Sequence, residues 1–114
     1  MSLRPGFSII IPTFNRAFCI CEAVDSVLMQ NYPDFELIVV DDGSSDGTDM
    51  LLKERYGAEM ACGRLKYLQS GHEGVSAARN KGLRAATREW AGYLDTDNRM
   101  CADYFAVFEN AVRT

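Results

Sequence analysis

The chain has 114 residues, of which 47% are hydrophobic and 25% are charged, a composition typical of one ordinary globular domain. Its net charge of −4 argues against the extended basic surface by which proteins bind nucleic acid. Its apolar runs are far shorter than the roughly 20 residues that cross a bilayer, and no signal-peptide pattern opens the chain. We therefore expect no membrane span and a cytoplasmic protein, or one at the cytoplasmic face of the membrane.

The first part of the chain predicts two buried strands with a helix between them. Residues 7–11 and 35–40 are β-rich apolar runs without polar alternation, as in parallel sheets that are covered on both faces. Residues 17–30 carry apolar side chains at helical spacing. We expect this helix to end at Asn31, because the following residues include Pro33, which disfavours helix in the residue before it.

The second part continues the alternation and predicts the same kind of fold. Gly57 is expected to close the helix at 48–56. The remaining elements are expected as strands at 65–68 and 91–94 and helices at 76–88 and after Asp103. This order predicts an α/β protein, a three-layer α/β/α sandwich around a mostly parallel sheet.

Polar segments follow three of the four predicted strands. They are residues 12–16, 41–46 and 95–98. Each alone is ordinary turn chemistry, but ligands of parallel sheets bind outside the carboxyl ends of the strands. Three such segments at one edge therefore predict a ligand site.

Asp95 and Asp97 permit three interpretations: a metal clamp for a diphosphate, the catalytic pair of a phosphatase, or solvated acids on a loop. The sequence contains neither G-x-G-x-x-G nor G-x-x-x-x-G-K-[ST], so a glycine-rich phosphate loop is not supported. Carboxylates repel phosphates unless a hard cation, Mg²⁺ or Mn²⁺, takes oxygen ligands from both. A zinc site is not expected, because the four cysteines form no C-x-x-C pair and only one histidine is present.

Four segments in order resemble the family 2 glycosyltransferases. They are "SIIIPTFNR" (8–16), "SVLMQNYPDFELIVVDDGSSDGT" (26–48), "GHEGVSAARNKGLRAA" (71–86) and "GYLDTDN" (92–98). The resemblance implies a Rossmann-like GT-A fold that binds a nucleotide-sugar donor, most often a uridine-based one, with Mn²⁺ or Mg²⁺. It also implies inverting transfer of the sugar to an acceptor hydroxyl, for example in polysaccharide biosynthesis. The acceptor is open: a polysaccharide, a lipid-linked sugar or a protein.

The resemblance also implies a set of site residues. The donor-binding set is Pro12, Thr13, Phe14, Asn15, Asp41, Asp42, Arg79, Asp95, Thr96 and Asp97. The first three would lie along the uracil and ribose, Asp42 would accept from the base with Asp41 bracing the loop, and Arg79 would face the base or the phosphates. Asp97 would be the metal ligand of the D-x-D motif, with Asp95 beside it near the ribose and donor sugar.

Simpler roles are open for some of these residues. Arg79 could form a surface ion pair, and Phe14 could pack in the core. His72 stands where the family often has Asn and is interpreted as a loop residue. Asn98 replaces a further acid found in many relatives, which would lower metal affinity modestly.

Residues 4–114 are expected to be only the donor-binding part of such an enzyme, or a truncated product. The residues after Asp97 suffice for one helix, whereas in the family the acceptor-binding half follows with its general base. We therefore expect no catalytic base in this chain, no transfer by the chain alone, and self-association through an exposed edge of the core.

Three alternatives compete with this interpretation. A haloacid-dehalogenase-type phosphatase also carries D-x-D, but on the first strand of its core rather than the fourth. A phospho-acceptor receiver domain needs an acidic pair after its first strand and a later Lys, which does not occur after Asp97. The third is a nucleotide-binding or interaction module that retains the fold without catalysis.

Overall fold

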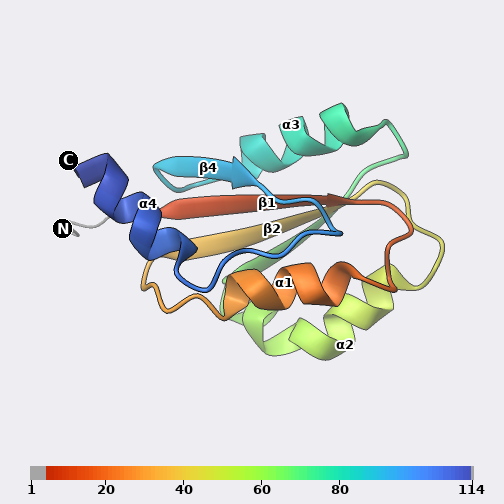
Figure 1. Cartoon of the computed structure of the whole chain (residues 1–114). Helices are drawn as coiled ribbons and strands as arrows, with labels where there is room; N and C mark the ends of the chain where they lie inside the picture. Colours follow the sequence, from red (N-terminus) through yellow and green to blue (C-terminus); the bar gives the residue numbers. More distant parts are fainter. Residues whose placement is uncertain (1–4, 114) are drawn as a thin grey trace.

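Strands and helices alternate along the chain in the predicted order, in a computed structural model that describes residues 5–113 (Figure 1). The strands are β1 (Phe7–Thr13), β2 (Phe35–Asp41), β3 (Leu65–Gln69) and β4 (Trp90–Tyr93). The helices are α1 (Ile20–Leu28), α2 (Thr48–Ala61), α3 (Val75–Ala85) and α4 (Tyr104–Arg113).

The four strands form one sheet in the order β3-β2-β1-β4, and every neighbouring pair is parallel. Phe7 of β1 pairs with Phe35 of β2 on one side and with Trp90 of β4 on the other. Both central strands, β1 and β2, are buried along their whole length, as their continuous apolar sequences predict. The carboxyl ends of the strands therefore meet at one edge of the sheet.

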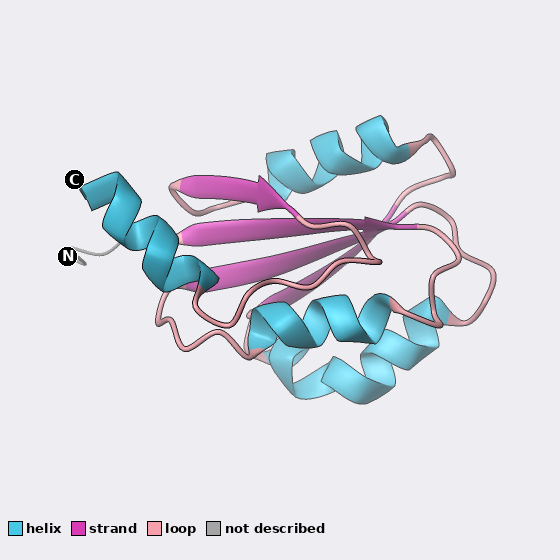
Figure 2. Ribbon diagram, in the orientation of Figure 1, coloured by secondary structure: helices cyan, strands magenta, loops and turns pink. Residues whose placement is uncertain are grey.

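Helices cover both faces of the sheet, which confirms the three-layer α/β/α prediction (Figure 2). Alternate residues of β1 point to opposite faces. Ile9 and Ile11 pack with α1, α2 and α4, whereas Ile10 packs with Ala78 of α3. The second contact requires Gly82, because a Cβ atom there would lie 2.5 Å from Cγ2 of Ile10.

Three helices differ in extent from the prediction. Helix α3 ends at Ala85 rather than at residue 88, because Ala86 is already extended (φ −67°, ψ 135°) and the next N–H, that of Thr87, donates to Glu36. Helix α2 does not stop at Gly57 but continues to Ala61, with non-helical dihedral angles at Tyr56 (φ −120°, ψ 26°). Gly57 faces open space, and the buried side chains of Leu52 and Tyr56 hold the helix to the sheet, so packing overrides the weak propensity of glycine. Helix α1 is shorter than 17–30, because the residues before Ile20 form a loop that contacts the β2–α2 connection.

A buried carboxylate closes the amino end of the sheet, where an uninterrupted apolar strand was predicted. Oε2 of Glu36 accepts hydrogen bonds from Ser8 Oγ (2.7 Å) and from the backbone N–H of Thr87 (2.7 Å), and its Oε1 lies 2.8 Å from Lys66 Nζ. Burial raises the pKa of Glu36, but Lys66, Ser8 and Thr87 lower it more, to about 2. Glu36 thereby joins the three strands β1, β2 and β3 to the α3–β4 connection.

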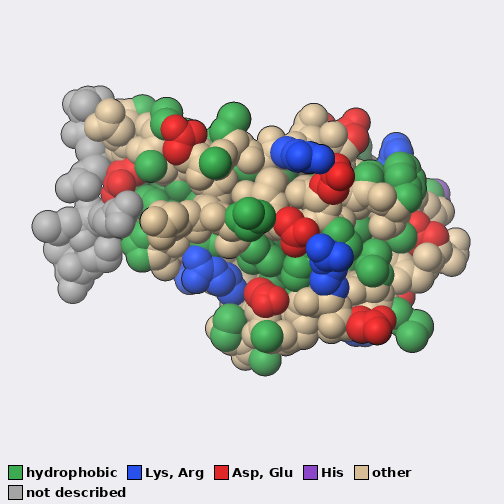
Figure 3. All heavy atoms as spheres, turned by 60° about the horizontal axis from the view of Figure 1, so that its bottom comes forward, with side chains coloured by type: hydrophobic (Ala, Val, Ile, Leu, Met, Phe, Trp, Pro, Cys, Tyr) green, Lys and Arg blue, Asp and Glu red, His purple; other side chains and the backbone are tan. Residues whose placement is uncertain are grey.

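The surface carries mixed charge. On the face shown in Figure 3, acidic and basic side chains lie interspersed with hydrophobic ones. Several large hydrophobic side chains are exposed, among them Phe18 and Met29 at 78% and 80%. None of the helices within residues 5–113 has both the length and the apolar character needed to cross a membrane.

Candidate nucleotide-binding site

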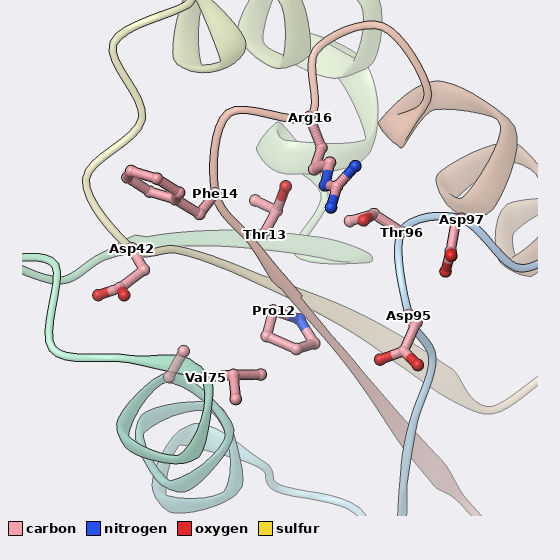
Figure 4. A pocket seen from close by; sticks show the side chains of 10 residues that line it. Pro12, Thr13, Phe14, Arg16, Asp42, Val75, Asp95, Thr96 and Asp97 are labelled. Atoms are coloured by element: carbon pink, nitrogen blue, oxygen red, sulfur yellow. The ribbon is translucent and has the colours of Figure 1, made fainter.

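A cavity of about 380 Å³ opens at the carboxyl ends of β1, β2 and β4 (Figure 4). It is lined by Pro12, Thr13, Phe14, Arg16, Asp42, Val75, Ala78, Asp95, Thr96 and Asp97. Phe14 and Asp42 lie on one side of the cavity and Asp95 and Asp97 on the other, with Pro12 between them (Figure 4). Seven of the ten predicted donor-binding residues are thus brought to one place.

The end of β1 forms the floor of the cavity. Thr13 is buried, and its Oγ1 has no hydrogen-bond partner within residues 5–113. A buried hydroxyl without a partner is costly, so a polar ligand atom would satisfy it. Phe14 is 40% exposed, and its ring centroid lies 4.4 Å from that of His72. It is therefore an accessible aromatic surface rather than a core residue.

Asp42 lines the cavity, and its carboxylate already accepts three hydrogen bonds from the β3–α3 loop. Ser70 Oγ donates to Oδ1 (2.7 Å), as does the backbone N–H of Glu73 (2.8 Å), and the N–H of Gly74 donates to Oδ2 (2.8 Å). Burial raises the pKa of Asp42, but these hydrogen bonds and nearby His72 lower it more, so the pKa lies below its usual range. Asp42 is ionised at neutral pH and fixes the β3–α3 loop, and Oδ2 retains room for a further donor.

Asp41 and Asn15 lie outside the cavity lining and hold its loops. Asp41 accepts from the N–H of Ser44 (2.9 Å) and from the hydroxyl of Tyr67 (2.6 Å), which places it on the opposite face of β2 from Asp42. Asn15 adopts a left-handed φ of 51° and accepts from the N–H of Ser45 (2.8 Å). Asn15 fixes the β2–α2 loop against the end of β1, and Asp41 fixes the start of the same loop and joins it to β3.

Arg79 also lies outside the cavity lining. Its Nη2 is 3.4 Å from Oδ1 of Asp95, and its guanidinium carbon lies 5.6 Å from the centroid of the Tyr93 ring. The Arg79 Nε is buried and has no hydrogen-bond partner among the described residues. The ion pair with Asp95 matches the simpler role considered for Arg79, and a role toward a base or phosphate stays a prediction.

Asp95 and Asp97 could hold a divalent cation only together with a ligand. Within residues 5–113 no group of three or more His, Cys, Asp or Glu side chains is arranged to bind a metal. The side chain of Asp95 is 55% exposed and Asp97 is also exposed, so both offer carboxylate oxygens to the open cavity. Mg²⁺ is usually held by one or two carboxylates together with substrate phosphates and water. The donor set fits that mode of binding and does not fit an all-protein cage.

The sequence analysis missed three lining residues, Arg16, Val75 and Ala78. Of the described residues that line the cavity, Arg16 is the one cation, and it makes no ion pair within residues 5–113. It extends over the cavity from the β1–α1 loop (Figure 4). Its position next to Asn15 at the strand end was a usable signal, and the spacing of three between Val75 and Ala78 marks one face of α3.

The sequence is similar to those of known glycosyltransferases. A family model described as Glycosyl transferase family 2 matches residues 8–108. The chain is 35% identical to the GalNAc(5)-diNAcBac-PP-undecaprenol beta-1,3-glucosyltransferase of Campylobacter jejuni, over 84% of this chain and 31% of that protein. It is 33% identical to the glycosyltransferase GlyA of Streptococcus pneumoniae, over 91% of this chain and 14% of that protein.

Solved structures show the same arrangement of elements. The mannosyltransferase PcManGT of Pyrobaculum calidifontis, in complex with GDP-Man and Mn²⁺, superposes with a TM-score of 0.81 at 32% identity, over 98% of this chain and 32% of that one. S. aureus TarS 1–349 in complex with UDP-GlcNAc superposes with a TM-score of 0.78 at 31% identity, over 94% of this chain and 30% of that one. The chain therefore spans about a third or less of the length of each of these relatives.

Proposed function

Because the chain belongs to glycosyl transferase family 2, we propose that it is the donor-binding part of an enzyme that transfers a sugar from a nucleoside-diphosphate sugar to an acceptor hydroxyl. The donor proposed is uridine-based. One observation carries the proposal: a single cavity has an aromatic ring and an engaged carboxylate on one side and two accessible carboxylates on the other. An aromatic ring at one side of the cavity and two carboxylates able to hold a metal ion at the other suit an elongated ligand with a planar base and a diphosphate.

The base and ribose would occupy the side formed by Phe14, Asp42 and Thr13. Phe14 presents a ring face for stacking, and aromatic stacking of a base contributes about 1–3 kcal/mol. The free lone pair of Asp42 would accept from a ring N–H of the base. Thr13 Oγ1, which has no partner among the described residues, would gain one from the ribose or from the phosphate.

The diphosphate would lie between Arg16 and the D-x-D motif. Asp97, with Asp95 beside it, would hold Mn²⁺ or Mg²⁺ jointly with the phosphate oxygens, and the cation would supply electrostatic stabilisation of the departing diphosphate. The guanidinium of Arg16 would contribute charge-assisted hydrogen bonds to phosphate oxygens. Arg79 would keep Asp95 oriented through their ion pair. We assign no general base within residues 5–113, so activation of the acceptor hydroxyl is proposed to need residues outside this chain.

Calorimetric titration of UDP into the chain, with and without Mn²⁺ and with GDP as the comparison nucleotide, tests this function. We expect binding that strengthens with Mn²⁺ and favours UDP. Asp97→Ala should weaken binding in the presence of Mn²⁺ at least about tenfold, a loss of ~1.4 kcal/mol, and leave metal-free binding unchanged.

Each result separates the proposal from an alternative. Tighter binding of GDP would replace uridine by guanosine in the proposal. Unchanged binding by the Asp97 variant would contradict the metal clamp. Hydrolysis of a generic aryl phosphate would instead favour the phosphatase. Binding without transfer by the full-length protein would favour a nucleotide-binding module without catalysis.

A further inference from the structure

Asp97 is aimed by its backbone rather than by side-chain contacts. It is exposed and forms no hydrogen bond or ion pair with another residue in the described part of the chain. On its amino side the chain is fixed to β1, because the N–H of Leu94 donates to the carbonyl of Ile10 (3.0 Å). A turn follows in which the N–H of Asn98 donates to the carbonyl of Asp95 (3.1 Å). The position of Asp97 therefore depends on what fixes the chain after this turn.

Three side chains on α1 and just after it fix that segment. They are Glu22, Ser26 and Gln30, which are spaced by four residues and so face the same side of the helix. Ser26 Oγ donates to the carbonyl of Ala23 (2.7 Å) and accepts from the N–H of Met100 (2.9 Å). The first bond orients the hydroxyl, so that a lone pair is directed at Met100.

Gln30 binds the backbone at Cys101 and Phe105 through both the nitrogen and the oxygen of its side-chain amide. It is buried, with 5% of its surface exposed. Its Nε2 donates to the carbonyl of Cys101, and its Oε1 accepts from the N–H of Phe105 (3.4 Å). The third contact, between Glu22 and Arg99 (3.1 Å), joins side chains that are 65% and 69% exposed, so we expect it to contribute little.

Hydrogen bonds act here together with packing, because the side chains of Met100 and Phe105 are buried in the hydrophobic core while the backbone around them lies beside open space. A second cavity of about 380 Å³ lies between α1 and the segment after the D-x-D motif, lined by Glu22, Asp25, Ser26, Met29, Arg99, Met100 and Ala102. The loop 95–99 is thus anchored at Leu94 on one side and at Met100 and Cys101 on the other, beside open space. Short loops anchored at both ends hold a side chain much more narrowly than loops anchored at one end.

We propose that Ser26 and Gln30 are positioning residues for the metal-binding carboxylate of Asp97. They act from the opposite side of the loop and do not reach the nucleotide cavity, whose lining contains neither of them. The inference rests on the proposed function, in which Asp97 holds a divalent cation with the diphosphate. It adds that α1 determines how well the cation is held.

The first test needs neither nucleotide nor metal. Amide hydrogen exchange of Asn98 reports the D-x-D turn, because this N–H is bonded to Asp95. In Ser26→Ala we expect Asn98 to exchange about fivefold faster or more, the change that follows from loss of one ordinary hydrogen bond. Ser26→Thr keeps the hydroxyl, and Ser26 lines the second cavity, which offers space for one more methyl group, so this variant should exchange like the native chain. An unchanged Asn98 rate in Ser26→Ala would overturn the inference.

The control variant weakens α1 without touching the loop. Asp25 accepts from the hydroxyl of Tyr56 (2.6 Å) and from Arg55 Nη2 (2.9 Å), both on α2. Asp25→Ala therefore removes two side-chain hydrogen bonds of α1, as Ser26→Ala does, but none of those that hold residues 99–105. We expect its Asn98 amide to exchange at the native rate. Equal acceleration in both variants would mean that general loosening of α1 is responsible and would overturn the inference.

The second test measures the ratio of UDP affinities with and without Mn²⁺ in the same variants. Ser26→Ala should lower this ratio about fivefold, while Ser26→Thr and Asp25→Ala keep it. If Ser26→Ala had the same ratio of UDP affinities as the native chain, the positioning role would be contradicted. If Mn²⁺ did not change the UDP affinity of the native chain, the proposed metal site itself would be refuted. The exchange experiment distinguishes failure of the metal site from failure of the positioning role, because it involves no ligand.

Discussion

At the scale of single residues, Asp42 shows how one side chain can serve the fold and a ligand at once. Asp42 is buried, with 5% of its surface exposed, and its carboxylate fixes the β3–α3 loop through three hydrogen bonds. The strand alternation that directs Asp42 into the cavity directs Asp41 to the other face of β2. The acidic pair is therefore two residues with separate structural tasks.

Asp42→Asn should weaken both the loop and nucleotide binding. The amide offers one acceptor oxygen where the carboxylate offers two, so at least one backbone N–H of Glu73 or Gly74 loses its partner, at a cost of about 1–3 kcal/mol. Thermal unfolding measures this loss, and calorimetry measures UDP affinity, which we expect to fall about tenfold. Ser70→Ala is the matched control, because it removes one hydrogen bond of the loop and keeps the carboxylate. Equal loss of UDP affinity in both variants would assign the effect to the loop alone.

At the scale of elements, the two ends of the sheet are built for different purposes. The carboxyl end of β1 leaves the Thr13 hydroxyl unpaired among the described residues. At the amino end, Glu36 accepts hydrogen bonds at Oε2 from Ser8 and Thr87 and forms an ion pair at Oε1 with Lys66. A polar group that is buried and fully paired stabilises a fold, and one that is left unpaired favours a ligand. We therefore assign Glu36 to stability and the opposite end to binding.

Glu36 should make stability depend on acid pH. Its pKa of about 2 in the folded chain lies below its ordinary value of 4.5. The folded state therefore gains stability from the ionised carboxylate above pH 4.5, and this gain is lost as the pH falls toward 2. Glu36→Gln should lower the free energy of unfolding at pH 7 by about 2–3 kcal/mol and flatten its decline below pH 4.5. Urea unfolding at several pH values measures both, with Glu89→Gln, an exposed acid in the same α3–β4 connection, as control. Parallel pH profiles for the native chain and Glu36→Gln would contradict this.

At the scale of the whole molecule, β4 is an outer strand with exposed hydrophobic side chains near it on both faces. Trp90 is 40% exposed and Tyr93 48%, and Leu83 of α3 and Val107 of α4 are 46% and 60% exposed. Outer strands with accessible backbone groups and apolar surroundings are sites of association. The self-association expected from the sequence stays a prediction, and this edge is where we place it.

Sedimentation velocity should show association of the chain in the micromolar range. Val107→Lys should reduce it, because a charge beside the edge strand opposes contact between two copies. Met50→Lys is the control: Met50 is 71% exposed but lies on α2. A native chain that sediments as a monomer at every concentration, without binding a dye for exposed apolar surface, would refute the prediction.

Much of this architecture could be predicted from local sequence. The order of strands and helices follows from apolar periodicity, and the ligand site follows from the polar residues at strand ends, because both signals lie within short windows. The resemblance to the glycosyltransferase family named Asp42, Asp95 and Asp97, and all three line the cavity. Boundaries were less certain: Gly57 did not end α2, since the helix is held by packing of Leu52 and Tyr56 on the sheet.

The sequence by itself therefore determined the alternation of elements, the parallel sheet and the edge at which the polar segments gather. Only the tertiary structure decided that Arg16 extends over the cavity, that Arg79 pairs with Asp95, and that Ser26 holds Met100. The physical reason is separation along the chain. Ser26 and Met100 are 74 residues apart, and no local propensity or periodicity encodes a contact that forms only when β1 brings β2 and β4 to its two sides.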